Sequence, residues 1–150
     1  MGPPLGPRAR RRPGALILRS DEIRKRRHGL PRDPPAPGAY APAESAAVHA
    51  ALFALAETAL RGGHSVIADA AFLDPALRQG IAAVAAEAGV PFQGVWLEAP
   101  LDLLRQRVAA RRGDASDADV AVLESMAAAE AGPIDWRRLD VTATMPEAAP

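Results

Sequence analysis

The chain has 150 residues, of which 49% are hydrophobic and 24% charged, and its formal net charge is zero. These values are typical of one soluble globular domain, because the chain is too short for two independent domains and has no apolar run that would cross a membrane. The absence of cysteine excludes disulfides, thiolate metal sites and a cysteine nucleophile. We therefore expect a cytoplasmic protein.

The zero net charge hides a basic head and an acidic body. Residues 1–32 contain ten basic and two acidic side chains, a net charge of +8, so the remainder carries −8. Such a block is able to bind nucleic acid. Arginine outnumbers lysine 17 to 1, however, which indicates a coding bias rather than selection for a nucleic-acid partner. Nucleic-acid binding through this head remains an alternative, and its prolines exclude the amphipathic helix of a transit peptide.

Strands and helices are predicted to alternate along the chain. Residues 1–13 and 143–150 are expected to be a disordered basic arm and a disordered tail, with one folded domain over residues 14–142. Within the domain, hydrophobic spacing and turn residues predict strands over 15–18, 64–69, 92–97 and 138–141, and helices over 21–28, 42–61, 74–88, 100–111 and 116–130.

Two of the predicted helices have clear apolar stripes. The first, over 42–61, places Val48, Leu52, Leu55 and Ala59 at helical spacing. The second begins at Asp74-Pro75, a favourable cap and first turn, and its stripe is made by Leu77, Ile81, Val84 and Ala88. Strands that alternate with such helices predict a parallel sheet with helices on both faces and right-handed connections.

Polar residues follow the predicted strands where ligands collect in parallel α/β sheets, at the carboxyl ends. Asp21 follows the first strand and Asp69 ends the second, while Arg107, Arg111 and Arg112 follow the third strand by way of a helix. A carboxylate at a strand end is able to hold Mg²⁺, and arginines clamp phosphate as bidentate donors. Together these residues indicate phosphoryl transfer, although each one alone also fits a helix cap, a turn or a solvated helix face.

The histidines and tryptophans carry no chemistry in this interpretation. His28, His49 and His64 have no spacing typical of metal ligands. Trp96 and Trp136 are expected to pack in the fold rather than stack on bases.

Five segments together resemble the P-loop kinases that are often fused to an aminoglycoside-phosphotransferase-like domain and, more distantly, polynucleotide kinase, gluconate kinase and zeta toxin. The resemblance covers residues 14 to 142. It rests on LRSDEIRK (18–25), SVIADAAF (65–72), VWLEAP (95–100), RVAARRGDASDA (107–118) and GPIDW (132–136).

The resemblance implies an α/β fold of the P-loop NTPase type and an ATP-dependent kinase that uses Mg²⁺. Asp21 would accept the proton of a substrate hydroxyl, and Arg24 would orient the acceptor. Asp69 would be the nucleotide-binding acid at the end of a Walker B-like strand and the Mg²⁺ ligand. Arg107 and Arg111 would lie over the transferred phosphate, with Arg112 beside the nucleotide. The implied substrate is a small hydroxylated acceptor, and an aminoglycoside-phosphotransferase-like domain is a possible partner.

One motif of these kinases is missing from the sequence. Their Gly-x-x-x-x-Gly-Lys-[Ser/Thr] loop stands about 20 residues before the Asp21 motif, whereas residues 1–18 contain no Lys, Ser or Thr. We therefore expect the sheet to lack its first, mid-sheet strand and its phosphate cradle, and ATP to bind weakly if at all. A frame shift or wrong start is expected to account for the arm. A non-catalytic binding or structural remnant is the other alternative.

Overall fold

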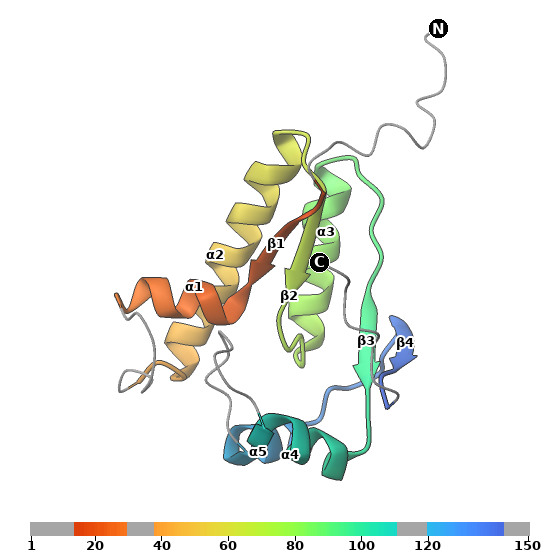
Figure 1. The fold of residues 1–150 in the computed structure, drawn as a ribbon. Coiled ribbons are helices and arrows are strands. Elements are labelled where there is room, and N and C mark those ends of the chain that lie inside the picture. Colours follow the sequence, from red (N-terminus) through yellow and green to blue (C-terminus); the bar gives the residue numbers. More distant parts are fainter. Residues whose placement is uncertain (1–13, 30–37, 111–119, 143–150) are drawn as a thin grey trace, which may run out of the picture.

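The computed structural model describes residues 14–29, 38–110 and 120–142, and its elements alternate as the sequence predicts (Figure 1). The predicted arm and tail, Ser116, Arg111 and Arg112 lie outside the described residues. The elements in chain order are β1 (Leu16–Arg19), α1 (Ser20–Arg27), α2 (Pro42–Arg61), β2 (Val66–Asp69), α3 (Pro75–Glu87), β3 (Val95–Glu98), α4 (Leu101–Ala110), α5 (Val120–Ala128) and β4 (Arg137–Asp140).

Helix α2 forms the centre of the core. Its buried residues recur every three or four positions, at Val48, Leu52, Ala56 and Ala59, and Val48 and Leu52 have no exposed surface. Leu55, predicted on this stripe, is 44% exposed, and Ala56 lies in its place because the buried face is rotated by one residue. Pro42 in the first turn and Glu44 beside it favour the start of the helix at this point.

Helix α3 packs on α2. Asp74 caps it as predicted, because its carboxylate accepts a 2.8 Å hydrogen bond from the N–H of Ala76. The helix buries Ile81 and Ala85, with Leu77 and Val84 packed partly buried against the same core. The described helices include none that is both long and apolar enough to cross a membrane.

The four strands form two parallel ladders. In the first, β1 pairs with β2 so that Ile17 lies opposite Ile67; in the second, β3 pairs with β4 so that Leu97 lies opposite Leu139. The parallel pairing confirms the predicted mixed α/β arrangement. The sequence predicted one parallel sheet without its mid-sheet strand. Within the described residues β2 and β3 are not hydrogen-bonded to each other, so the strands form two separate two-stranded ladders. In Figure 1 the arrows of β2 and β3 point the same way.

Helical cover is uneven between the two faces of the strands. Helix α2 packs on both β1 and β2, and the side chains of Leu18, Val66 and Ala68 pack against the core on that face. Alternate residues point the other way, where Ile17 is 57% and Ile67 52% exposed. Among the described residues, a helix covers one face of the β1–β2 ladder, so the prediction of helices on both faces holds for that face only.

The two ladders are joined by a set of contacts that we call the seam: Phe72, Arg78, Gly94, Trp96 and Trp136. The Trp136 ring packs edge-on against Phe72, with 5.3 Å between ring centroids, and lies directly against Gly94. The Arg78 guanidinium lies 5.6 Å from the centre of the Trp96 ring. Both tryptophans are thus packing groups, as predicted.

Arg78 holds the seam through main-chain carbonyls. Its side chain is 3% exposed, and its guanidinium donates to carbonyl oxygens on both sides of the seam. The acceptors are Phe72 at 2.6 Å, Leu73 at 2.9 Å, Ala131 at 2.6 Å and Pro133 at 3.3 Å. Phe72 has a left-handed backbone, with φ of 48°, a conformation that costs a non-glycine residue about 1 kcal/mol or more and needs such support.

Candidate functional site

The carboxyl ends of β1 and β2 bring the first two predicted site residues to one edge. Arg19 and Asp69 are register partners, and the Arg19 Nε donates to the Asp69 carboxylate at 3.1 Å. Helix α1 begins at Ser20, directly after Arg19, the last residue of β1. Asp21 therefore lies in the first turn of α1, at the same edge as Asp69.

Asp21 and Asp69 differ in their surroundings. Asp21 is partly buried in the first helical turn, where the helix dipole stabilises a carboxylate. The Asp69 side chain is 58% exposed and forms an ion pair with Arg19. An exposed ion pair of this kind is worth little to stability, typically below about 1 kcal/mol, so the Asp69 carboxylate is able to exchange Arg19 for another cation.

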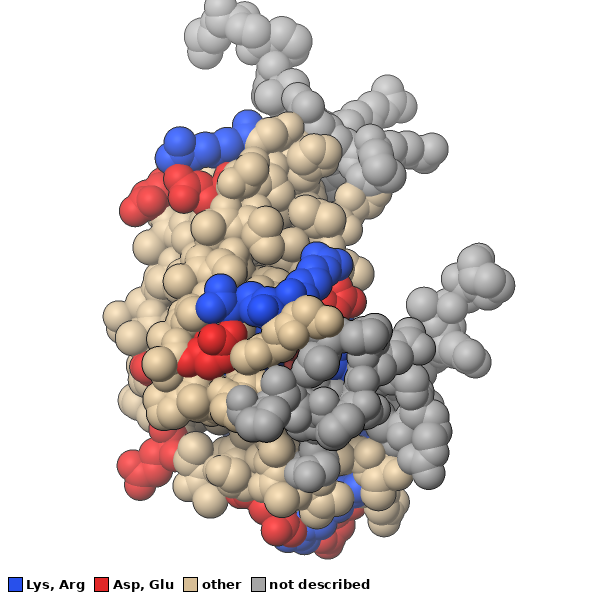
Figure 2. All heavy atoms as spheres, turned by 90° about the vertical axis from the view of Figure 1, so that its left-hand side faces the viewer, with Lys and Arg blue, Asp and Glu red and all other residues tan. Residues whose placement is uncertain are grey.

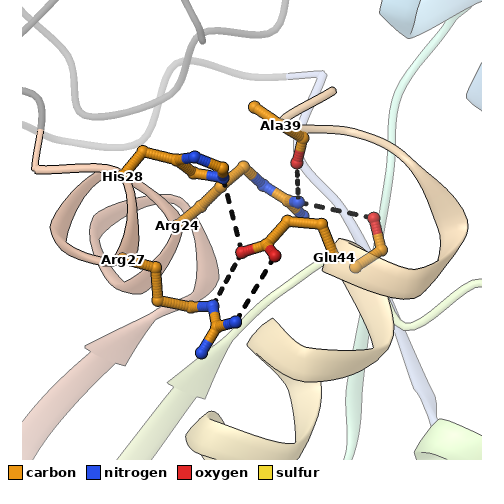
Figure 3. Close-up of polar contacts among 6 residues, drawn as sticks. Arg24, Arg27, His28, Ala39 and Glu44 are labelled. Carbon is orange, nitrogen blue, oxygen red and sulfur yellow. Dashed lines mark hydrogen bonds and ion pairs between the residues drawn. The ribbon is translucent and has the colours of Figure 1, made fainter. Parts of the chain in front are cut away.

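Arg24 is buried against protein groups (Figure 3). Its side chain is 7% exposed, and its Nη1 donates to the carbonyl of Ala39 and, at 3.4 Å, to the hydroxyl of Ser45. The guanidinium also lies 4.6 Å from the centre of the Tyr40 ring. Through these contacts Arg24 fastens the turn at residues 38–40 to α1 and α2, a role that the sequence interpretation did not include.

Glu44 links the same two helices. Arg27 donates to both of its carboxylate oxygens, at 2.7 and 3.4 Å, and the His28 Nε2 lies 3.4 Å from one of them (Figure 3). The hydrogen bond from Arg27 lowers the pKa of Glu44 below its ordinary value. This cluster was missed from sequence, because Arg27 and Glu44 are 17 residues apart and separated by a proline-rich loop.

Arg107 lies in α4, at the end toward which the arrows of β1, β2 and β3 point (Figure 1). Its Nη2 donates to the carbonyl of Thr142, just after β4, at 3.3 Å. Helix α4 is tied to α5 by Arg105, which pairs with Asp102 at 2.8 Å and Glu124 at 3.0 Å. Arg107 is thus held at the same end of the strands as Asp69, on a different element.

The described residues do not by themselves fit ATP with Mg²⁺. They contain no group of three histidine or acidic side chains close enough to hold a metal ion. In addition, β1 passes into α1 and β2 into α3 without the glycine-rich turn that lets backbone amides surround a phosphate. At the carboxyl edge of β1 and β2 they offer the exposed carboxylate of Asp69 and the partly buried one of Asp21, with Arg19 beside Asp69.

The basic residues of α1 and α2 alternate with acids on the surface. Arg26 pairs with Glu22 at 3.7 Å and Arg61 with Glu57 at 2.6 Å, each one helical turn apart. Figure 2 shows acidic side chains next to basic ones on the face that carries these helices. This pattern is typical of a solvated helix face rather than of a continuous phosphate-binding surface.

A family model described as an AAA domain matches residues 7–133, most of the chain. The chain belongs to this AAA-domain family. Its P-loop kinase-like members are nucleotide-binding proteins that generally use ATP with Mg²⁺. The matched range covers the described elements from β1 through α5, including both strand-end acids.

The chain is also similar to curated mycobacterial proteins. It is 30% identical over 128 residues to uncharacterized protein Mb2027c of Mycobacterium bovis and to uncharacterized protein Rv2004c of Mycobacterium tuberculosis. The alignments cover 82% of this chain and 25% of each relative. The chain therefore spans about a quarter of the length of these relatives. No solved structure matches it.

Proposed function

We propose that this AAA-family chain is an ATP-dependent phosphotransferase domain that keeps the acceptor side of its site and has lost the phosphate cradle. The observation that carries the proposal is the parallel register of β1 and β2, which pairs Asp69 with Arg19 at the carboxyl edge where α1 begins, with Asp21 in its first turn. Ligands of parallel α/β sheets bind at that edge. The missing Gly-x-x-x-x-Gly-Lys-[Ser/Thr] motif supports the loss of the cradle.

In this proposal each site residue has one task. Asp21 accepts the proton of the acceptor hydroxyl. Arg24 shapes the acceptor side by holding the turn at residues 38–40. Asp69 faces the nucleotide and Mg²⁺, and Arg107 supplies positive charge from α4. Arg111 and Arg112 complete the cationic set.

ATP with Mg²⁺, when bound, supplies the phosphoryl group and neutralises its charge. The described residues offer no cradle for it, so no transfer step follows from them alone. We further propose that the strand between β2 and β3 is the element whose loss removed the cradle. The acceptor is a small hydroxylated molecule, and the greater length of the relatives leaves room for an aminoglycoside-phosphotransferase-like partner domain.

Calorimetric titration of the full chain with ATP and Mg²⁺, together with release of labelled phosphate, tests the proposal. We expect a dissociation constant of about 1 mM or weaker and negligible turnover, because nothing holds the donor in line. Asp69→Asn should abolish the residual Mg²⁺-dependent binding, while the matched control Glu57→Gln on α2 should leave it unchanged.

Submicromolar ATP binding with Mg²⁺-dependent hydrolysis would contradict the loss of the cradle. Absence of any saturable ATP binding would instead contradict the nucleotide-binding role and favour a non-catalytic module.

A further inference from the structure

A cleft of about 580 Å³ lies between α3 and the segment that leads into β4. We call it the seam cleft, because three residues of the seam line it. It lies at the amino ends of β3 and β4, and the described residues that line it include none of the phosphotransfer site proposed above. One wall is made by Pro75, Arg78, Gln79 and Ala82, the other by Pro133, Asp135, Trp136 and Arg137, and Phe92 and Gly94 complete the lining.

The two walls of the seam cleft are fixed relative to each other. The Arg78 guanidinium donates to the carbonyl of Leu73, just before α3, at 2.9 Å and to that of Pro133, on the opposite wall, at 3.3 Å. Gly94 allows the Trp136 indole to lie directly against the main chain, because a Cβ at this position would overlap the ring. The cleft is therefore formed before any ligand enters, which lowers the entropic cost of binding.

The seam cleft contains a buried positive charge without a counter-ion. All four hydrogen bonds of the Arg78 guanidinium go to neutral main-chain oxygens, and among the described residues no carboxylate forms an ion pair with it. A buried charge of this kind is favourable only when an opposite charge or dipoles compensate it. Arg137 is exposed and also has no carboxylate partner in the described part of the chain. Both arginines therefore favour an anion in the cleft.

The remaining lining narrows the chemistry of that anion. Asp135 is exposed on the same wall as Arg137, so two arginines and one aspartate leave a single net positive charge. This balance favours one negative charge over the several charges of a nucleotide. The apolar lining includes Phe92, which is 42% exposed, and the half-buried Trp136, with 5.8 Å between their ring centroids. Aromatic walls suit a planar apolar group.

We propose that the seam cleft binds a small aromatic monocarboxylate. Its ring lies against Phe92 and Trp136, and its carboxylate lies toward Arg137, where the charge of Arg78 also stabilises it. The proposal goes beyond the phosphotransferase function and does not depend on it, because the two sites share no described residue.

Titration of the full chain with 3-phenylpropanoate tests the proposal. Tryptophan emission reports the binding, because Trp136 lines the cleft. We expect a saturable change with a dissociation constant of about 1 mM or below. The matched control is 3-phenylpropanamide, which has the same ring and chain length but no charge. It should bind at least fivefold more weakly, because hydrogen bonds between a guanidinium and a carboxylate are stronger than those to a neutral amide.

Two arginine variants locate the charge. Arg137→Gln should weaken binding of 3-phenylpropanoate at least fivefold and should remove the difference between acid and amide. Arg138→Gln is the matched control, because successive side chains of a strand point to opposite faces and Arg138 pairs with Glu98. Its affinity should stay within twofold of that of the original protein.

Two alanine variants locate the space. Ala82→Phe fills the cleft and should abolish binding, whereas Ala83→Phe, at an exposed position of the same helix that does not line the cleft, should leave it unchanged. Circular dichroism checks that both variants fold. If Ala82→Phe fails to fold, the comparison of Arg137→Gln with Arg138→Gln still decides.

Several results would overturn the proposal. Equal affinity for acid and amide, or unchanged binding by Arg137→Gln, would contradict the cationic site. Displacement of 3-phenylpropanoate by ATP with Mg²⁺ would place the ligand at the carboxyl edge of β2 instead. Absence of a saturable emission change, together with absence of heat in calorimetry, would show that the cleft takes no such ligand.

Discussion

The two halves of the molecule are held together in different ways. The first, from β1 through α3, contains all the hydrophobic residues that are buried in the described part of the chain, from Ile23 to Ala85. The second, from β3 through β4, has parallel pairing and two helices, yet neither α4 nor α5 has a buried residue. The comparison shows that the second half owes its place to the seam and not to a core of its own.

The largest expected effect comes from the core of the first half. Leu52→Ala removes a fully buried side chain from α2, and we expect the free energy of unfolding in urea to fall by about 2 to 5 kcal/mol. Leu97→Ala in the second half is the matched control, because Leu97 is 62% exposed. Its loss should stay below about 1 kcal/mol. Similar losses for both variants would refute the contrast between the halves.

Arg78 provides the next test, because it is the buried charge that joins the halves. Arg78→Met keeps much of the side-chain volume but removes the donors to Ala131 and Pro133. We expect stability to fall by about 2 to 3 kcal/mol, since buried carbonyls lose their partners. Hydrogen exchange should accelerate in β4 far more than in α2. Gln79→Met, on the exposed side of the same helix turn, should change neither measurement, and uniform acceleration in both halves would disprove the role of the seam.

The smallest effect concerns His49 in α2 and sharpens the comparison within the first half. Burial, followed by the positive charge of Arg24, lowers the pKa of His49 below its ordinary value. The unfolded chain therefore takes up a proton at a higher pH than the folded chain does. Stability should be fully present above the unfolded pKa of about 6.5 and should decline as the pH falls through that value toward the folded pKa.

Urea unfolding at several pH values between about 7.5 and 5 measures this decline. His49→Gln should flatten the curve, whereas substitution of the exposed His64 by Gln should leave it unchanged. If His49→Gln keeps the full pH dependence, another group causes it.

The parts of the fold that could be predicted are those fixed by local pattern. The stripe of α2, the Asp74 cap and the strand that ends at Asp69 all follow from spacing and turn residues. The start of β3 was predicted three residues too early, at Phe92, because Phe92 is apolar and is separated by only two residues from the apolar Val95 to Leu97. In the structure Phe92 packs on Trp136, with 5.8 Å between ring centroids, and pairing begins at Val95. The first paired residue of β3, Val95, is set by its register partner Arg137 on β4, which the local sequence around Phe92 does not indicate.

In the candidate site, too, the features set by local sequence were predicted and those set by distant partners were not. Sequence order placed Asp21 and Asp69 after neighbouring strands, and the register brings them to one edge. The burial of Arg24 was not predicted, because its partners Ala39 and Ser45 lie beyond a proline-rich loop. Arg78 was missed although a signal existed: it precedes Ile81 and Ala85 at helical spacing on the buried face of α3. A charged residue on such a face has to find buried partners.

The positions of the tryptophans have a consequence for optical measurements. The chain has two, and Trp96 and Trp136 both lie at the seam. Intrinsic fluorescence therefore reports on the junction of the halves, whereas circular dichroism is dominated by helices such as α2. If the junction opens before the core melts, the emission change will precede the loss of ellipticity, and the gap between the two curves will measure how independently the first half folds.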